Sequence, residues 1–495
     1  MLKKIFFYFI GAALTAAIGL ASSFVFTRIF NNVEFGMYSL VMSVVTTANV
    51  LANQWIQQAI NRYLPVQQET NDIQRIRNTI VFGICVETIV LVILDAVLLP
   101  AIAARYGRQW SSLALPASIY LILMNVFSIL GIVLQAEMRA KTYSYFNTMN
   151  ALVKFLFGIV MVIYIDKRTS SLLWGAALSV LLFIPALWAK AQLVPPIKLW
   201  VNFPIREYCL KLKEFAGYGF PMTIWYIAAN VLNIGDRYII QFIRGAGEVG
   251  IYSANYNIIS SAASLVAMPV LLAAHPFLMK AWDKGEKEAA GRWLGRIVEG
   301  IMCFGALLTA LTCIFSRELA RWFLGAGFRE GHFIMPIVVA GVVFWQLGMY
   351  TQKPMEFVKS TRSLVLLCLL AAAINIVSNL ILVPKYGYAA AAYTTLGSYA
   401  IYFVTSLIKG RKILPWKIDT FNLLVSLTAV LAGFFAVIHA RDFFSAHFNP
   451  TVSLVMVMFF CATISVFYAW HVVARLKEHG KASAVFLYGR KPNED

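Results

Sequence analysis

One six-residue stretch occurs twice in this sequence, first as Glu34-Phe35-Gly36-Met37-Tyr38-Ser39 and again as Glu248-Val249-Gly250-Ile251-Tyr252-Ser253. The two copies lie 214 residues apart (248 − 34), and each is predicted to sit in a short loop between two long apolar segments. A repeat of this kind in a membrane protein is typical of two homologous helix bundles that face each other. The repeat therefore predicts the architecture of a transporter.

The composition places the chain in a membrane. Of its 495 residues, 60% are hydrophobic and only 13% are charged, and the mean hydropathy is +0.72. So few charged residues cannot cover the surface of a soluble protein of this length, so the excess apolar surface must face lipid. Apolar runs of about 20 residues, long enough to cross about 30 Å of hydrocarbon, recur along the whole chain. The sequence predicts an all-α polytopic membrane protein.

Fourteen transmembrane helices are predicted from these runs. The spans are roughly 5–27, 37–60, 79–101, 113–134, 144–165, 171–189, 217–242, 251–275, 294–315, 333–351, 363–383, 387–408, 421–439 and 451–473. If the N-terminus is inside, the inner segments hold 29 Lys and Arg and the outer loops hold 11. Because Lys and Arg accumulate in cytoplasmic loops, this bias predicts that both termini are cytoplasmic. It also accounts for the net charge of +19 without a nucleic-acid partner.

The repeat also predicts the domain organisation. Six spans separate the two copies, so both copies should face the same side of the membrane and the halves should be parallel. We expect four parts: an N-terminal six-helix half (1–190), a cytoplasmic linker (191–216), a second six-helix half (217–410), and an added two-helix hairpin with a cytoplasmic tail (411–495).

Several short motifs together resemble one transporter family. They are Arg28 followed by Glu34-Phe35-Gly36-Met37-Tyr38, then Asp236-Arg237-Tyr238-Ile239-Ile240 leading into Gly247 to Ser253, and finally Leu134-Gln135-Ala136 and Pro384-Lys385-Tyr386-Gly387. The sequence resembles the Wzx-type polysaccharide-repeat-unit flippases, a branch of the multidrug/oligosaccharidyl-lipid/polysaccharide exporter superfamily. The resemblance covers nearly the whole chain.

The resemblance implies an exporter of the bacterial cytoplasmic membrane. Its substrate would be an undecaprenyl-diphosphate-linked oligosaccharide repeat unit for O-antigen, capsule or exopolysaccharide biosynthesis, moved by alternating access. The partners it implies are the lipid-linked oligosaccharide, membrane lipids, a glycan polymerase and a chain-length regulator. An ion-coupled multidrug antiporter of the same fold and a lipid II flippase remain alternatives.

Charged residues inside or at the ends of spans are candidates for the substrate site, because a cation in the membrane needs a partner or water. Lys154 lies near the middle of its span, and Glu87 is the available counter-ion. The two predict either a structural ion pair or a cavity site for an anion or a coupling cation. Glu87 and Asp95 are therefore candidates for ion coupling. Cavity candidates nearer the outer ends of the spans are Arg28, Asp236 and Arg237, with interfacial snorkelling as the alternative for the two arginines.

Polar stripes give further cavity candidates. Asn49, Asn53, Gln57 and Asn61 recur every four residues, and Tyr226, Asn230, Asn233 and Arg237 recur at spacings of four, three and four, so each set shares a helix face. Asn255 begins a third such set. Amides and aromatic rings suit sugar hydroxyls and rings, whereas the alternative is hydrogen bonding between helices.

Catalytic chemistry is not predicted. The sequence has no Walker A lysine, and no His, Cys and carboxylate cluster has metal-ligand spacing. We therefore expect no cofactor and no metal site, and a transporter instead of an enzyme such as a glycan polymerase.

Overall fold

The computed structural model is almost entirely α-helical, and it describes residues 2–66, 73–195, 204–449, 452–453, 455–466 and 468. The helices are α1 (Leu2–Ile29), α2 (Asn32–Val66), α3 (Ile73–Ala136), α4 (Ala140–Tyr164), α5 (Thr169–Ala191), α7 (Ile205–Arg244), α8 (Ala246–Asp283), α9 (Lys287–Phe323), the 3-10 helix η1 (Ala326–Ile334), α10 (Met335–Thr351), α11 (Lys353–Phe357), α12 (Thr361–Ile413) and α13 (Thr420–His447). A further apolar helix covers Val455–Val466.

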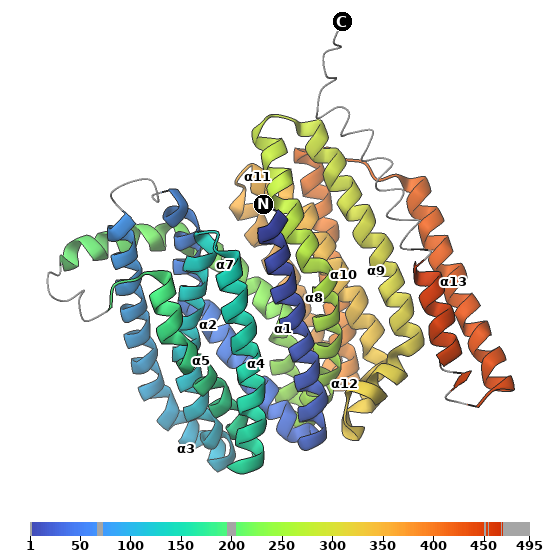
Figure 1. The fold of residues 1–495 in the computed structure, drawn as a ribbon, viewed down its shortest axis with the longest axis horizontal. Helices are drawn as coiled ribbons and strands as arrows, with labels where there is room; N and C mark the ends of the chain where they lie inside the picture. Colours follow the sequence, from blue (N-terminus) through green and yellow to red (C-terminus); the bar gives the residue numbers. More distant parts are fainter. Residues whose placement is uncertain are drawn as a thin grey trace, which may run out of the picture.

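The helices form two lobes and a separate hairpin (Figure 1). Helices α2 to α5 lie on one side, α8 to α12 lie on the other, α1 stands between them, and α13 packs on the far edge of the second lobe against α9. Both predicted six-helix halves and the added pair are therefore present. We call the end with the two repeated stretches the outer end, and the opposite end the inner end.

Two of the long helices each supply two predicted spans. The two halves of α3 lie against each other as a helical hairpin. Two contacts show this, one between Glu87 and Asn125 and one between Asp95 and Ser118. In α12 the backbone leaves helical geometry at Gly387, which has a φ of 62°. A positive φ of this size favours glycine, which has no Cβ to clash. The predicted boundary between spans 363–383 and 387–408 falls at this kink.

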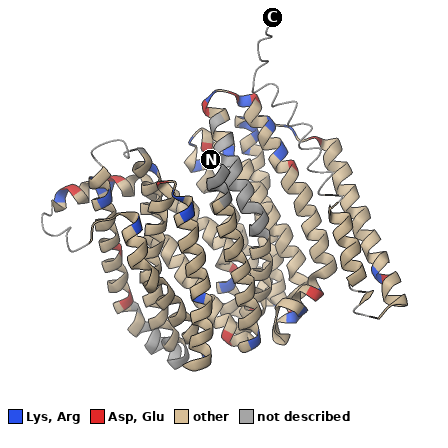
Figure 2. Cartoon of the chain, in the orientation of Figure 1, with Lys and Arg blue, Asp and Glu red and all other residues tan. Residues whose placement is uncertain are grey.

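The charge distribution fits a membrane protein. Figure 2 shows Lys, Arg, Asp and Glu mainly near the two ends of the helices, with long uncharged middles. Within the described residues, ten helices are long and apolar enough to cross a membrane. Predicted span 217–242 falls in α7, which is more polar and is not among the ten. Predicted span 251–275 falls in α8, where the side chains of 263–277 lie outside the described residues.

The predicted loops at the repeated stretches are wrong, because both stretches are helical and form the first turns of α2 and α8. Asn31 precedes α2 as its N-cap, and its Oδ1 accepts a hydrogen bond from the Glu34 backbone N–H at 2.9 Å. The Glu34 carboxylate accepts one in return from the Asn31 N–H at 3.3 Å. This reciprocal capping box starts the helix within two residues of the end of α1.

The two repeated stretches touch each other at the outer end. A Cβ on Gly36 would lie 1.8 Å from the carbonyl oxygen of Ala246, and a Cβ on Gly250 would lie 1.9 Å from that of Asn32. These contacts are equivalent under the 214-residue offset, since Asn32 corresponds to Ala246 and Gly36 to Gly250. Helices α2 and α8 therefore cross backbone to backbone on the pseudo-twofold axis. The prediction that both copies face the same side is confirmed.

The inner part of α7 ties the second lobe to the first. Predicted linker 191–216 is helical from Ile205 onward, while 196–203 lie outside the described residues. Tyr208 accepts a hydrogen bond from Asn78 of α3 at 3.2 Å, and Phe215 stacks on Tyr63 of α2 with ring centroids 5.4 Å apart. The first turns of α7 thus cross the inner ends of α2 and α3.

Candidate functional site

The lobes meet along a seam between α2 and α7 that polar side chains fill. Asn230 donates to Thr47 Oγ1 at 2.9 Å, and Tyr226 lies against Gln58. Farther toward the inner end, a Cβ on Gly219 would lie 2.0 Å from the carbonyl oxygen of Trp55, so the two backbones nearly touch. We define the lobe seam as these α2–α7 contacts.

Arg237 is the principal charge in this seam. Its guanidinium donates to Ser43 Oγ of α2 and to Asn257 Oδ1 of α8, both at 3.1 Å. The residue is 9% exposed, lies 5.6 Å from the centre of the Tyr256 ring, and its Nε has no hydrogen-bond partner among the described residues. Within that set Arg237 forms no ion pair. Its hydrogen-bond partners are neutral, and the charge of the adjacent Asp236 also attracts it. A buried guanidinium with neutral hydrogen-bond partners is a candidate anion site.

Asp236 points the other way, into the second lobe. It is fully buried, and its carboxylate accepts hydrogen bonds from Tyr252, from Thr395 at 3.4 Å and from the backbone N–H of Arg237 at 2.8 Å. Consecutive residues on a helix point about 100° apart. The structure therefore separates Asp236 from the seam, although the two residues are adjacent in sequence.

Lys154 lines a pocket of about 300 Å³ between the lobes. The pocket is bounded by Ser22 and Ser23 of α1, by Tyr38 of α2, and by Asn257 and Ser261 of α8, among other residues. Lys154 is half-buried and forms no hydrogen bond or ion pair with another described residue. A half-buried ammonium beside hydroxyl and amide groups suits a hydrated anion.

Asn257 connects the two cations. Its side chain lines the Lys154 pocket and also accepts the hydrogen bond from Arg237. The structure thus brings together two candidates, Lys154 and Arg237, from different lobes. We define the cationic site as Arg237, Lys154, Asn257 and Ser43. Asn257 and Ser43 were missed from the sequence, although Asn257 is one of several polar residues near the start of α8.

The ion pair considered between Lys154 and Glu87 is not formed. Glu87 is buried inside the first lobe, where it accepts a hydrogen bond from Asn125 at 3.2 Å. Asp95 lies beside Ser118 in the same helical hairpin. Both carboxylates thus face the other half of α3, whereas Lys154 faces α1 and α8.

The polar stripe of α2 lies within the first lobe. Gln57 donates to Asn53 at 2.7 Å, Asn53 donates to Asn49 at 2.9 Å, and Asn49 reaches Ser128 of α3 at 3.5 Å. Asn49 and Asn53 are buried. The stripe forms a ladder of hydrogen bonds that joins α2 to α3. This arrangement corresponds to the second interpretation given for the stripe, hydrogen bonding between helices, and not to a substrate cavity.

The stripe of α7 divides between two surfaces. Tyr226, Asn230 and Arg237 lie at the lobe seam, whereas Asn233 accepts a hydrogen bond from Tyr399 of α12 at 2.9 Å. Tyr399 also reaches the carbonyl oxygen of Leu232 at 3.3 Å. Asn233 therefore belongs to the interior of the second lobe.

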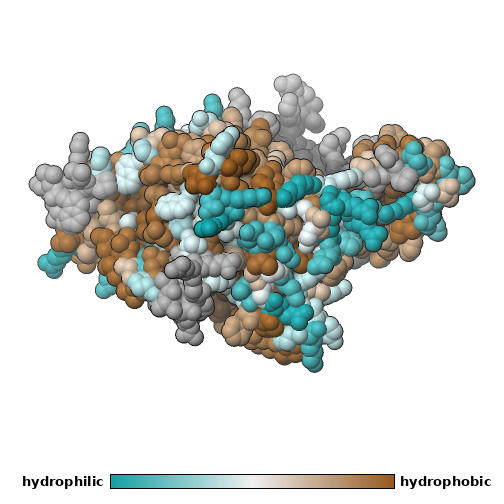
Figure 3. Space-filling model, turned by 90° about the horizontal axis from the view of Figure 1, so that it is seen from below, coloured by the Kyte–Doolittle hydropathy of each residue, from teal (hydrophilic) through white to brown (hydrophobic). Residues whose placement is uncertain are grey.

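Arg28 and Asn255 lie outside the cationic site and hold the outer end together. Arg28 donates to the carbonyl oxygen of Trp322 at 2.9 Å, at the C-terminus of α9. Asn255 is fully buried and donates to the carbonyl oxygen of Phe328 in η1 at 2.9 Å. Figure 3 shows this outer end, where a band of hydrophilic side chains crosses the middle of the face with hydrophobic side chains on both sides of it.

A second buried ladder in α12 was missed from the sequence. Asn379 donates to Asn375 at 3.1 Å, Asn375 donates to Thr395 at 3.2 Å, and Thr394 donates to Asn379 at 2.7 Å. The four-residue spacing of the two asparagines was the available signal. Thr395 links this ladder to Asp236.

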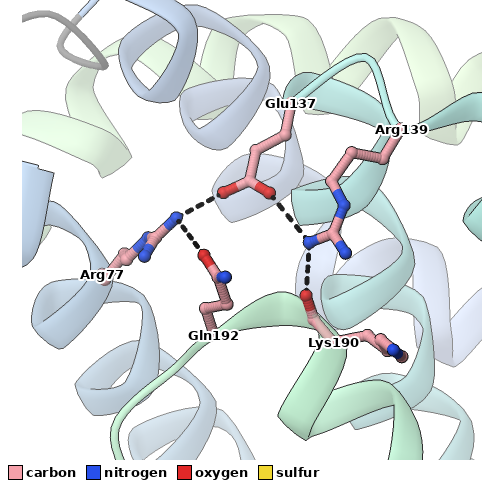
Figure 4. Close-up of polar contacts among 5 residues, drawn as sticks. All are labelled: Arg77, Glu137, Arg139, Lys190 and Gln192. Atoms are coloured by element: carbon pink, nitrogen blue, oxygen red, sulfur yellow. Dashed lines mark hydrogen bonds and ion pairs between the residues drawn. The ribbon is translucent and has the colours of Figure 1, made fainter.

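An ion-pair network fastens the inner end of the first lobe (Figure 4). Glu137 contacts Arg77 of α3 at 2.8 Å and Arg139 at 3.5 Å, and its side chain is only 7% exposed. Arg77 also reaches Gln192 at 3.3 Å, and Arg139 donates to the carbonyl oxygen of Lys190. The cluster joins α3, the start of α4 and the end of α5, at the end opposite the repeated stretches.

Known proteins match both the sequence and the fold. The family model described as "Polysaccharide biosynthesis protein" matches residues 1–282, more than half of the chain. An uncharacterized membrane protein of Methanocaldococcus jannaschii is 19% identical over 388 residues, which cover 75% of this chain and 76% of that protein.

Solved structures share the fold at low sequence identity. The lipid II flippase MurJ in an inward closed conformation has a TM-score of 0.76 at 15% identity, and the match covers 95% of this chain and 99% of MurJ. An inward-facing multidrug resistance MATE transporter of the MOP superfamily has a TM-score of 0.68 at 13% identity, covering 81% and 94% of the two chains. The chain therefore belongs to the polysaccharide biosynthesis protein family, and it is a multi-pass helical membrane protein that shares its fold with MurJ and the MATE transporters of the MOP superfamily.

Proposed function

We propose that this protein is a flippase for undecaprenyl-diphosphate-linked oligosaccharide repeat units in surface polysaccharide biosynthesis. It works in the bacterial cytoplasmic membrane with both termini in the cytoplasm, as the Lys and Arg bias of the loops indicates. The two lobes, divided at about residues 191–216, rock against each other to alternate access. A glycan polymerase and a chain-length regulator act on the exported product.

The observation that carries the proposal is that Arg237, which is buried and forms no ion pair among the described residues, contacts Asn257, a residue that also lines the Lys154 pocket. A transported diphosphate is an anion that must be held away from bulk water, and guanidinium groups bind such oxygens in a bidentate manner. In the present structure neutral Ser43 and Asn257 occupy two of the five N–H donors of Arg237, and Nε has no partner among the described residues. These weak partners can be exchanged for diphosphate oxygens without breaking an ion pair.

The charge pattern also separates this proposal from a cation exporter. A multidrug antiporter for organic cations needs carboxylates toward its cavity, but Asp236 is directed into the second lobe and Glu87 into the first. The groups at the cationic site are a guanidinium, an ammonium, an amide and a hydroxyl. Their net charge is positive.

Binding of farnesyl diphosphate to the purified protein tests the cationic site. We expect R237Q and K154Q each to weaken this binding by roughly 10- to 150-fold, because a hydrogen bond to a charged group contributes about 1.5–3 kcal/mol. The matched control is K167Q, which removes an exposed cation from an outer loop and should leave binding unchanged. Unchanged binding in both site variants, or tighter binding of the cation ethidium than of farnesyl diphosphate, contradicts the proposal.

Transport in cells tests the flippase itself. The charge reversals R237E and K154E should abolish export of a lipid-linked glycan while leaving the amount of protein in the membrane unchanged. Full export by both variants would remove the cationic site from the mechanism. A lipid II flippase uses the same prenyl diphosphate chemistry, and rescue of cells depleted of their lipid II flippase would identify that alternative substrate.

A further inference from the structure

A second basic pocket lies at the inner end of the second lobe, away from the cationic site. It has a volume of about 940 Å³ and lies between the first turns of α9, the end of α12 and residues 414–420, which lead into α13. Arg292 of α9, Arg411 of α12, and Trp416 and Lys417 of the connection line it. The proposed transport mechanism uses none of these residues.

The pocket wall is held by backbone packing. A Cβ on Gly291 would lie 2.8 Å from the carbonyl oxygen of Pro415, and one on Gly295 would lie 2.3 Å from that of Lys417. The connection therefore runs directly over two successive turns of α9. Leu414 and Trp416 are buried in the core of the lobe. These contacts fix where Arg411 and Lys417 lie.

The charge of the pocket is positive. Its three cations are accompanied by one lining carboxylate, Glu288, which is 93% exposed and pairs with Arg292 at 3.5 Å. The guanidinium of Arg411 stacks over the Trp416 ring at 4.7 Å, and Lys417 forms no ion pair among the described residues. Two cations thus remain available to an anion.

Trp416 adds an unused donor. The residue is 5% exposed, and its indole Nε1–H has no hydrogen-bond acceptor among the described residues. A buried N–H without an acceptor is costly unless some other group satisfies it. Tryptophan is also enriched where apolar spans meet the polar headgroups of a bilayer.

A separate apolar cavity lies deeper toward the membrane interior, on the same face of α13. Leu423 of α13 lines the basic pocket, and Leu427 and Leu431, one and two turns farther along the same face, line a cavity of about 500 Å³ between α9, α10 and α13. Met302 and Phe434 line it as well. A basic pocket for a headgroup, followed one turn along α13 by an apolar cavity, offers the two parts of a phospholipid site.

We propose that this pocket binds the headgroup of an anionic phospholipid, with one acyl chain in the cavity between α9, α10 and α13. The phosphate lies between Arg411 and Lys417, and a headgroup oxygen accepts the indole N–H of Trp416. The bound lipid fastens the α13 hairpin to the second lobe. This site is independent of the proposed transport function.

The test compares lipids by their effect on thermal unfolding of the purified full-length protein in a non-ionic detergent. Dioctanoyl phosphatidylglycerol should raise the unfolding temperature with a saturable dependence on lipid concentration, and dioctanoyl phosphatidylcholine should bind at least tenfold more weakly. The variant R411Q/K417Q should bind phosphatidylglycerol about thirtyfold more weakly, because each basic residue near anionic lipid contributes about fivefold. Native mass spectrometry should show fewer retained phosphatidylglycerol molecules on the variant.

The matched control is K412Q, which removes an exposed cation next to Arg411 that does not line the pocket. It should change the affinity less than twofold. A loss in K412Q as large as that in a matched single variant K417Q, for which about a fivefold loss is expected, would mean general surface attraction and would overturn the proposal. Equal effects of the two lipids would also overturn it, as would equal protection by inorganic phosphate at the same concentration, which indicates a free-anion site.

Discussion

Adding one methyl group at the crossing of α2 and α8 should force the outer end open. The Cβ of G250A would lie 1.9 Å from the carbonyl oxygen of Asn32, and that of G36A would lie 1.8 Å from the oxygen of Ala246. Carbon and carbonyl oxygen atoms normally approach no closer than about 3.3 Å. The helices must therefore separate by roughly 1.4 Å, and neither obstacle is a side chain that could rotate away.

The energetic cost follows from this overlap. Overpacking a tight contact costs about 1–3 kcal/mol, and about 1.4 kcal/mol corresponds to a tenfold change in an equilibrium. Each single variant should thus shift the balance between closed and open outer ends by roughly 5- to 150-fold. The double variant G36A/G250A should cost less than the sum of the singles, because one separation of the helices relieves both overlaps.

Cross-linking of paired cysteines with a short thiol-reactive linker measures this shift. A Cβ on Gly247 would lie 3.7 Å from Asn32 Nδ2, so the pair N32C/G247C should be bridged by such a linker when the outer end is closed. In a background without the six native cysteines, G250A should slow this cross-linking and reduce transport. The control is G397A, whose added Cβ meets nothing within 4 Å. Unchanged cross-linking and transport in G250A would refute the assignment of this crossing as the outer closure.

Three further predictions concern stability, each measured by thermal unfolding of the purified protein. E137Q should destabilise the first lobe by about 3 kcal/mol, because it removes the partner of two arginines from a nearly buried network. The control is E207Q, which breaks the exposed ion pair between Glu207 and Arg75 and should cost under about 1 kcal/mol. N53A should cost about 1–2 kcal/mol and leave farnesyl diphosphate binding unchanged, so weakened binding would show that the ladder also serves the substrate. G387A should cost about 1–2 kcal/mol because of its φ of 62°, and E248A, which removes the carboxylate 2.6 Å from the added Cβ, should relieve only part of that cost.

Length and hydropathy sufficed to predict most of the helices, because each apolar run needs one hydrocarbon thickness to cross. They missed the first turns of α7, which begins at Ile205 inside the predicted linker. The repeat at Gly36 and Gly250 correctly predicted parallel lobes, since equivalent segments of parallel repeats face the same side. The same stretch was misjudged as a loop. The Asn31 to Glu34 capping box was visible in the sequence and marks the start of a helix.

The site was harder to predict because helical periodicity shows which residues share a face, but not what that face contacts. The four-residue spacing of Asn49 and Asn53 was correct, yet their neighbour is α3 and not a cavity. Asp236 and Arg237 are adjacent but serve different surfaces. Asn257 became a candidate only when the fold placed it between Arg237 and Lys154.

Gly36 and Gly250 let the backbones of α2 and α8 touch at their crossing. Beside this contact Phe35 shares a buried apolar cluster with Val249 and Tyr252, and its ring meets that of Phe328 edge-on with centroids 5.4 Å apart. The glycine-to-carbonyl contacts are weak, each contributing about 0.5–1 kcal/mol, so the apolar cluster supplies most of the attraction that opening must overcome. The backbone contact therefore sets the position at which the two helices meet, and the buried apolar area sets how firmly they stay together.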